Sequence, residues 1–329
     1  MRKWIFLIMV LLISVVLLSS ATLAEKKLIP IRIAYHNNIS GASLVSIAQQ
    51  LGYFKQEGLD PKFFRFTSGP PEITAMIAGD LDVGFIGPGA MFLVMEGRVN
   101  YIAVDSLATG DMILGYPGKG VKTVKNLENK KIGVALGTSE EMLLRVALKV
   151  NGLSFDKVQV VPMSPENQVA AFSTGQLDAV ATYSPYTGQI RTMMPDVDVV
   201  LTSKDLYPKF IFPQGWIANT NFMAKNPEGA RRFIRAIMRA NTVRLNGDET
   251  VSLTSKFSEV PADLLRKDLE AVTSLSTAEL KVAFKDGTVE KWLNSLSDIF
   301  VEIGRIKAPI PTSQYFNKKL FLEATKNLK

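Results

Sequence analysis

The residue types that most often carry out catalysis are scarce in this chain of 329 residues. It contains a single histidine, His36, and no cysteine, so neither a zinc-type cluster nor a cysteine nucleophile can be built. The Gly-x-Ser-x-Gly elbow, the Gly-x-x-x-x-Gly-Lys-Ser/Thr loop and the Gly-x-Gly-x-x-Gly fingerprint do not occur either. We therefore expect a protein that is not an enzyme and that uses no metal or cofactor, although catalysis by dispersed residues stays open.

What the sequence offers instead is a set of short polar loops, each between a predicted strand and a predicted helix. Free N–H groups and the helix dipole at a helix N-terminus can hold an oxyanion, and open α/β sheets bind ligands at the carboxyl ends of their strands. The alternative is that Ser68, Ser139 and Ser184 only cap their helices. Capping and binding can also share a residue. The loops are residues 36–41, 68–71, 87–90, 137–140 and 183–186.

Alternating strands and helices must position these loops. Residues 31–35 alternate apolar and polar side chains as a strand does, and apolar residues recur at helical spacing over 44–51. Residues 62–67 and 81–86 predict further strands, with a helix at 71–78 between them. This alternation predicts an α/β fold with mainly parallel sheets flanked by helices.

The same order of elements returns about 95 residues later, which indicates an internal repeat. Strands are predicted at 131–135, 158–162 and 179–182, with helices at 140–150 and 167–173. Two repeats are too few for a solenoid, so we expect two facing lobes with a cleft between them. The turn residues that match in order are Ala78-Gly79-Asp80-Leu81-Asp82 with Thr174-Gly175-Gln176-Leu177-Asp178, Gly58-Leu59 with Gly152-Leu153, and Gly87-Pro88 with Ser184-Pro185.

The remainder of the chain has no such repeat and is expected to be largely helical, with helices at 227–245, 261–272 and 288–303. We expect the chain to cross back near Pro213, so that these helices pack on the first lobe. The predicted division is 1–24 as a signal peptide, 25–116 and 214–329 as lobe 1, and 117–213 as lobe 2.

Glycine and proline near the two expected crossings, at 115–118 and 213–215, predict a hinge. A hinge beside a cleft suits closure on a ligand.

The amino terminus has the pattern of a secretory signal peptide. Arg2 and Lys3 precede an apolar run from Trp4 to Leu18, and small residues follow up to Ala24. The run is shorter than the roughly 18 residues of a spanning helix, so we predict cleavage after Ala24, with an uncleaved membrane anchor as the alternative. Without a cysteine for lipid attachment, the pattern favours a free periplasmic protein that is not membrane-embedded.

The charge of the chain is modestly basic. The formal charge is +7, and removal of Arg2 and Lys3 with the signal peptide lowers it by two. Basic pairs such as Lys130-Lys131 and Arg231-Arg232 are scattered along the chain and lack interleaved aromatic residues. Solvated surface explains them better than nucleic-acid binding, so we expect no nucleic-acid partner.

Several segments of the mature chain together match the pattern of one protein family. They are residues 31–35, 51–59, 68–69, 78–80, 124–133 and 183–186. They resemble the nitrate, sulfonate and taurine class of periplasmic solute-binding proteins, which has the two-lobed type II periplasmic binding protein fold. The resemblance covers nearly all of the mature chain and is specific for the family rather than for a ligand.

This resemblance implies a monomer that captures a small organic anion or zwitterion, sulfonate-like, in the cleft and delivers it to an ABC permease and its ATPase. In taurine binders, the stretch corresponding to 212–218 resembles one that carries an aspartate for the amine, and here Gln214 stands at that place. The other implied ligand-binding residues are His36, Asn37, Ser68, Gly69, Pro70, Gly87, Pro88, Gly89, Thr138, Ser139, Glu140, Tyr183, Tyr186 and Trp216.

Two interpretations apply to Glu140 and Glu141, which begin the helix after 137–139. They could simply complement the helix dipole. The functional hypothesis is that Glu140 faces the cleft and accepts a hydrogen bond from a ligand amine, which would disfavour a bare dianion.

Other functions remain open on the sequence alone. The same fold could bind an aromatic or pyrimidine-type ligand, or form a pyrimidine enzymatically, although the enzyme of this fold is expected to need a cysteine-rich segment that this chain lacks. A regulatory sensor would need an attached signalling or DNA-binding domain.

Overall fold

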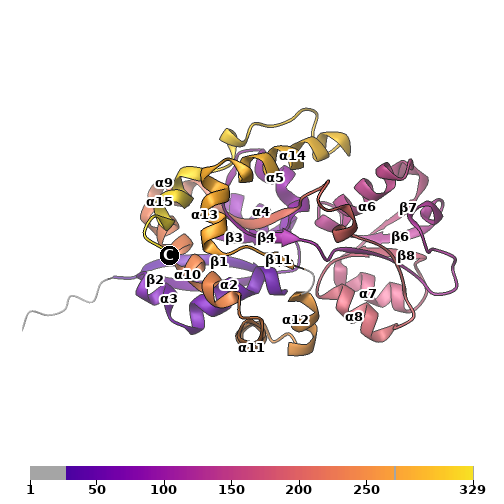
Figure 1. Ribbon diagram of the computed structural model, residues 1–329, viewed down its shortest axis with the longest axis horizontal. Coiled ribbons are helices and arrows are strands. Elements are labelled where there is room, and N and C mark those ends of the chain that lie inside the picture. The colour runs from indigo at the N-terminus through magenta and orange to yellow at the C-terminus, as the bar shows by residue number, and fades with distance from the viewer. Residues whose placement is uncertain (1–26, 270–271, 329) are drawn as a thin grey trace, which may run out of the picture.

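The computed structural model describes residues 27–269 and 272–328, which form two α/β lobes side by side (Figure 1). The predicted signal peptide, residues 1–24, lies outside the described residues. Across the described ranges, no helix has both the length and the apolar character needed to cross a membrane.

Lobe 1 is built on a six-stranded sheet with the order β11-β4-β10-β3-β1-β2. The strands β2, β1 and β3 are parallel, whereas β10 runs antiparallel to β3 and β4, and β11 antiparallel to β4. The bounds are β1 (Ile29–His36), β2 (Leu59–Phe66), β3 (Val83–Ile86), β4 (Val99–Ala108), β10 (Pro213–Asn219) and β11 (Val272–Ser274).

Lobe 2 is built on a five-stranded sheet with the order β7-β6-β8-β5-β9. The strands β7, β6 and β8 are parallel, and β5 is antiparallel to β8 and β9. Because β2-β1-β3 and β7-β6-β8 have the same arrangement, the predicted repeat and the two-lobed α/β fold are confirmed; the antiparallel strands make each sheet mixed. The bounds are β5 (Met112–Gly115), β6 (Lys131–Val134), β7 (Gln159–Pro162), β8 (Ala179–Thr182) and β9 (Asp198–Thr202).

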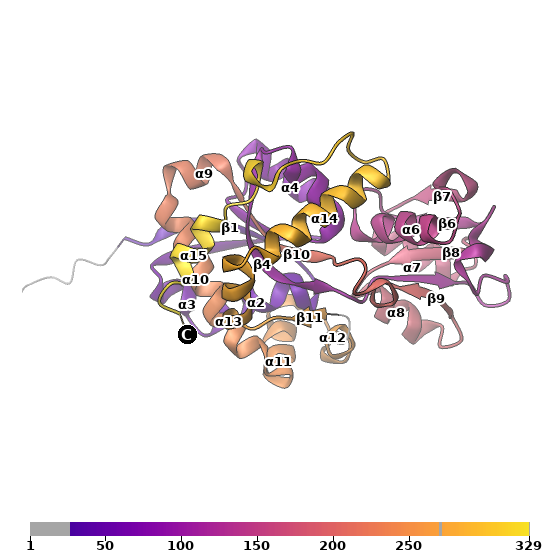
Figure 2. The same cartoon turned by 45° about the horizontal axis from the view of Figure 1, so that its top comes forward.

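Helices flank both sheets, and the C-terminal helices cover lobe 1 (Figures 1 and 2). The helices of lobe 2 are α6 (Ser139–Val150), α7 (Pro165–Ser173) and α8 (Tyr186–Met193). Those of lobe 1 are α2 (Ile39–Gln50), α3 (Tyr53–Gln56), α4 (Gly69–Ala78), α5 (Met91–Met95), α9 (Thr220–Lys225), α10 (Pro227–Arg244), α11 (Gly247–Ser258), α12 (Ala262–Leu269), α13 (Thr277–Lys285), α14 (Thr288–Glu302) and α15 (Lys318–Thr325). Short 3-10 turns occur at η1 (Pro88–Ala90), η2 (Val124–Leu127), η3 (Phe155–Lys157), η4 (Ser203–Leu206) and η5 (Thr312–Gln314).

The chain crosses between the lobes twice. The first crossing lies between Ala108, the end of β4, and Met112, the start of β5. The expected crossing and hinge at 115–118, and the lobe boundary at 116, are therefore placed too late, because Gly115 already pairs within the lobe 2 sheet. A four-residue strand is too short to show a period in the sequence. The return crossing lies between Thr202 and Pro213.

Two further differences concern β11, at the edge of the lobe 1 sheet, and its neighbour β4. The helix expected over 261–272 ends at Leu269, and Val272 begins the edge strand β11. The strand β4 was not predicted at all. Both strands matter for function because their ends reach the cavity described below.

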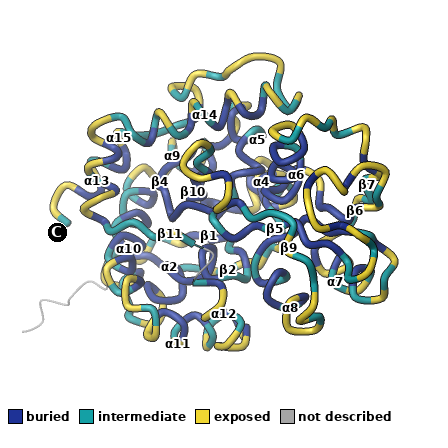
Figure 3. Tube along the Cα trace, turned by 45° about the vertical axis from the view of Figure 1, so that its right-hand side comes forward, coloured by how far each residue is buried: buried dark blue, intermediate teal, exposed yellow. Residues whose placement is uncertain are grey.

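The apolar core is continuous through lobe 1 and along the inner side of α6 in lobe 2. A smaller cluster, which includes Leu114, Phe172 and Val180, is separate from it within lobe 2. Figure 3 shows the buried segments concentrated in the sheets and inner helices. The strands β3, β10 and β8, which are buried throughout, lie on the two sides of the cleft and hold the loops in place.

Candidate functional site

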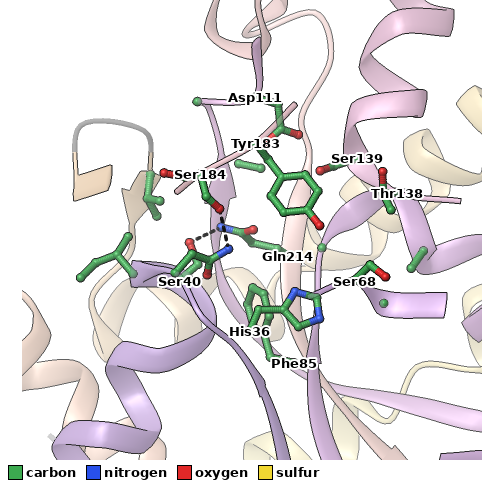
Figure 4. A pocket seen from close by; sticks show the side chains of 18 residues that line it. His36, Ser40, Ser68, Phe85, Asp111, Thr138, Ser139, Tyr183, Ser184 and Gln214 are labelled. Atoms are coloured by element: carbon green, nitrogen blue, oxygen red, sulfur yellow. Dashed lines mark hydrogen bonds between the residues drawn. The ribbon is translucent and has the colours of Figure 1, made fainter. Parts of the chain in front are cut away.

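A partly open cavity lies between the lobes, where loops of both halves meet (Figure 4). It offers about 50 Å³ to the centres of water molecules, so it has room for more than one of them. Only a small ligand fits this space. Its lining residues are His36, Asn38, Ile39, Ser40, Ser68, Gly69, Phe85, Gly87, Ala90, Ala108, Gly110, Asp111, Thr138, Ser139, Tyr183, Ser184, Gln214 and Val272.

Three helices begin at this cavity: α2 after Asn38, α4 after Ser68 and α6 after Thr138. The Asn38 side chain accepts a hydrogen bond from Gly41 N, at 2.8 Å, and so caps α2. Neither Ser68 nor Thr138 caps its helix through its side chain; the Thr138 hydroxyl donates to Ala135 O instead, at 2.7 Å. The free N–H groups at the start of α6 therefore have no cap from the side chain of Thr138, as an anion site at a helix end requires. In α4, Gly69 alone offers such an N–H before Glu72, because Pro70 and Pro71 have none.

Asp111 is the acidic side chain of the lining. Burial raises its pKa to about 6, against the opposing effect of a hydrogen bond from the Ser139 hydroxyl. A carboxyl group held in this way changes its ionisation readily when a cation approaches. Asp111 is therefore suited to accept a hydrogen bond from a ligand ammonium group.

His36 is the basic side chain of the lining, and it is paired behind the cavity wall. Its Nε2 lies 3.0 Å from Oε2 of Glu72, a fully buried residue of α4. Burial raises the pKa of Glu72, and the adjacent His36 opposes that shift. Among the described residues, no lysine or arginine lines the cavity.

Contacts on both sides of the cavity join the lobes. The Tyr183 hydroxyl donates to Thr67 O, and Asn38 Nδ2 donates to Ser184 O at 3.2 Å. Gly89 also packs against the backbone of Thr138, where a Cβ would come within 2.0 Å of the Thr138 carbonyl carbon. The lobes are thus closed on the cavity.

Eight of the sequence-predicted residues lie in the lining. They are His36, Ser68, Gly69, Gly87, Thr138, Ser139, Tyr183 and Gln214.

The hypothesis that Glu140 faces the cleft is wrong. Glu140 is fully buried within lobe 2, where its Oε1 accepts hydrogen bonds from Ala135 N and, at 2.7 Å, from Gln168 Nε2. Burial raises the pKa of Glu140 well above its usual value. The side chain points toward α7 and fastens α6 to it, so it does not meet the ligand.

Trp216 does not line the cavity either. It is completely buried in lobe 1, where its Nε1 donates to Asp105 Oδ2 at 3.2 Å. Gln214, two residues earlier on the same strand, reaches the lining because β10 shifts its register against β4 after that residue.

Other predicted residues lie near the cavity but outside its lining. Asn37 and Tyr186 lie in a separate groove between the lobes, where the Tyr186 hydroxyl donates to Glu166 at 2.8 Å. Pro70 lies in another surface groove. Pro88 and Gly89 are buried in the 3-10 turn η1.

The sequence reasoning missed several lining residues. Asn38, Ile39, Ser40, Ala90 and Ser184 belong to loops that were predicted, so the signal was present in the residue ranges. Ala108, Gly110 and Asp111 were missed because the crossing was placed too late, and Phe85 and Val272 because strand ends alone do not show which side chains face a cleft.

The arrangement defines a class of protein: two α/β lobes with a small cavity between them at their crossing points. The family described as NMT1/THI5 like matches residues 42–247. The chain belongs to this family.

Relatives and solved structures agree with that assignment. A Brucella abortus protein that bears the provisional description of a binding protein is 36% identical, covering 96% of this chain and 98% of its own. A Bacillus subtilis protein provisionally described as binding aliphatic sulfonates is 27% identical. The match covers 77% of this chain and 76% of the Bacillus protein. The alkanesulfonate-binding protein SsuA of Xanthomonas axonopodis pv. citri, solved with MOPS, has the same fold, with a TM-score of 0.67 and 19% identity over 88% of this chain and 98% of its own.

An enzyme is also among the relatives. The 4-amino-5-hydroxymethyl-2-methylpyrimidine phosphate synthase of Aspergillus parasiticus is 27% identical, covering 59% of this chain and 60% of its own. The fold thus serves both binding and catalysis, and only the site can distinguish them.

Proposed function

We propose that the mature protein is the periplasmic substrate-binding component of an ABC importer, and that it holds a small organic anion or zwitterion in the interlobe cavity. The observation that carries this proposal is the cavity itself, closed by both lobes and reached by three helix N-termini. Relatives described as sulfonate-binding proteins support the ligand class.

The anionic end of the ligand is assigned to the helix N-termini. The N–H groups that open α4 and α6 lie at Gly69 and Ser139, on opposite lobes. An anion bound to both would join the lobes and favour the closed state. The Ser68 hydroxyl can donate to the same group, whereas the Ser139 hydroxyl already donates to Asp111.

The positive or donor end is assigned to the side of Asp111. A bare dianion would be repelled by this carboxylate, whereas an ammonium group would be attracted. Asp111 thus takes the role of amine acceptor that the sequence analysis gave to Glu140.

We propose binding without chemical turnover, and delivery of the unchanged ligand to a permease. A pyrimidine-type ligand is a second candidate, because the rings of Phe85 and Tyr183 line the same cavity and a pyrimidine phosphate synthase is among the relatives. Stacking on such rings suits a flat heterocycle.

A thermal-shift screen of the mature protein tests the proposal. The panel contains small sulfonates, aminosulfonates, carboxylates, nitrate, sulfate and pyrimidines. We expect stabilisation by a monoanion or zwitterion and recovery of that ligand unchanged by mass spectrometry. Stabilisation by pyrimidines alone would favour the second candidate, and recovery of a product would contradict the binding function.

Export is tested separately, on the protein expressed with its amino terminus intact. Mass spectrometry of the exported protein should find a chain that begins near Glu25. An intact chain retained in the membrane fraction would contradict both cleavage and periplasmic localisation.

A further inference from the structure

A buried ion pair lies directly behind the Gln214 side of the cavity. Arg244 Nη1 donates to Asp105 Oδ1 at 2.7 Å, and Arg244 Nη2 donates to Asp105 O at 2.6 Å. Both side chains are almost wholly buried. Asp105 Oδ2 accepts from Trp216 Nε1, so the carboxylate receives hydrogen bonds on both oxygens. With Arg244 beside it, this group acts only as an acceptor.

The ion pair sets the direction of the next hydrogen bond toward the cavity. Ser106 Oγ lies 2.7 Å from Asp105 Oδ1 and must donate its single hydrogen there, because a carboxylate has none to give. Toward any other neighbour, Ser106 Oγ can only accept. That neighbour is Gln214 Nε2, at 2.9 Å.

The amide of Gln214 is consequently fixed in one orientation. Its two N–H bonds point to Ser106 Oγ and to Ser40 Oγ, the latter at 2.8 Å. The opposite orientation would place Oε1 against Ser106 Oγ, two acceptors in contact. Figure 4 shows the amide nitrogen on the side of Ser40 and the oxygen turned away from it. Oε1 is left to the cavity, which Gln214 lines.

We infer that the Asp105–Ser106 relay makes Gln214 Oε1 a fixed hydrogen-bond acceptor, and that the ligand presents an N–H donor to it. The part that concerns the ligand rests on the proposed binding function; the orientation of the amide does not. The Gln214 side of the cavity therefore selects for an amine, ammonium or amide group and against an oxyanion.

The orientation can be measured without any ligand by NMR of the isotope-labelled protein. The Gln214 side-chain NH2 signals are identified by their loss in the Gln214→Met variant. In the wild type, both hydrogens should exchange slowly with solvent and show nuclear Overhauser effects to the side chains of Ser40 and Ser106. Rapid exchange, with no such effects, would mean that the NH2 group faces the cavity and would overturn the inference.

The selectivity is measured by calorimetry with taurine and ethanesulfonate, which differ by one amine. We expect taurine to bind about ten- to a hundredfold more tightly, as for a hydrogen bond to a charged group. Ser106→Ala should reduce this ratio because the amide can then turn over. Ser43→Ala is the matched control, since Ser43 is equally buried on α2 but its hydroxyl has no partner among the described residues.

The outcomes separate the inference from the function on which it rests. Equal wild-type affinities for the two probes, or a ratio unchanged in Ser106→Ala, would overturn the acceptor role while leaving the binding function intact. If neither probe nor any other small anion bound, the proposed function would fail and the inferred donor contact with it, and the NMR result would still decide the orientation of the amide. If Ser106→Ala does not fold, equal wild-type affinities for the two probes, or rapid exchange of the amide hydrogens, would still overturn the inference.

Discussion

The two halves of the repeat carry a buried polar residue at the same helix position but pair it with different partners. In lobe 1, Glu72 is the fourth residue of α4 and pairs with His36, which lines the cavity. In lobe 2, Gln168 is the fourth residue of α7 and donates to Glu140, which lies behind the cavity wall. Lobe 1 places its paired histidine at the cavity, whereas lobe 2 keeps its paired acid behind the wall.

This difference shows that a repeated backbone does not repeat the chemistry of the site. Lobe 2 supplies its acid from Asp111, at the crossing between the lobes, rather than from the equivalent loop. The lobe 1 side of the cavity, here called the lobe 1 wall, contains the buried pairs His36–Glu72 and Arg244–Asp105. Such pairs resist rearrangement only while both partners are present. The lobe 2 wall holds a carboxyl group whose charge is free to respond to a ligand.

The largest expected effect tests whether the lobe 1 wall depends on its paired charges. Replacing Arg244 with methionine leaves Asp105 buried without its cation, so we expect the free energy of unfolding to fall by about 3–5 kcal/mol. Arg266→Met is the control, because Arg266 pairs with Asp248 at the exposed surface and should lose at most about 1 kcal/mol. Urea unfolding of the three proteins measures both. Similar losses in the two variants would contradict this account of lobe 1.

A smaller effect is expected when the two buried acids are compared directly. Glu72→Gln removes the partner of His36, so the free energy of unfolding should fall by about 1–3 kcal/mol. Because His36 lines the cavity, ligand binding should also weaken. Glu140→Gln should leave affinity unchanged, because Glu140 does not reach the cavity.

The pH dependence of the Glu140 variant sharpens this comparison. Because burial raises the pKa of Glu140 in the folded state, its ionisation lowers the stability of the wild type as the pH rises. Glu140→Gln should therefore gain stability relative to the wild type between low and neutral pH. A loss of affinity in this variant, measured by calorimetry, would return Glu140 to the site.

The smallest effect concerns the charge of Asp111. With a pKa of about 6, its carboxyl group is protonated below that pH in the ligand-free protein and ionised above it. An ammonium ligand favours the ionised form, so affinity for taurine should rise by up to about tenfold per pH unit below 6 and level off above it. Asp111→Asn should abolish this dependence, which also controls for titration of the nearby Glu140. An unchanged pH profile in the variant would assign the dependence to another group.

The sequence predicted the scaffold better than the site. Apolar periodicity and matched turn residues gave the repeated strands and helices, because those patterns record which face of each element is buried. The loops at 36–41, 68–71 and 183–186 were placed at the cleft because each follows the carboxyl end of a predicted strand. Asp111 could not be found in this way, because its position depends on where the chain crosses between the lobes.

The direction in which a side chain points was the other feature that the sequence did not predict. Glu140 begins a helix at the cavity, yet it turns toward Gln168 because a buried partner is available there. Trp216 lies two residues from Gln214 but faces the core and Asp105. Such choices depend on residues distant in sequence, so no local pattern reveals them.

The central claim is that two lobes close on a small ligand and release it unchanged, and small-angle X-ray scattering tests it most directly. The structure shows the closed arrangement, in which hydrogen bonds from Tyr183 to Thr67 and from Arg305 to Glu141 join the two lobes. The account predicts that the protein stripped of ligand has a larger radius of gyration, which falls when the ligand found by the screen is added, and that mass spectrometry recovers that ligand intact. Identical scattering with and without a bound ligand, or recovery of a converted product, would contradict it.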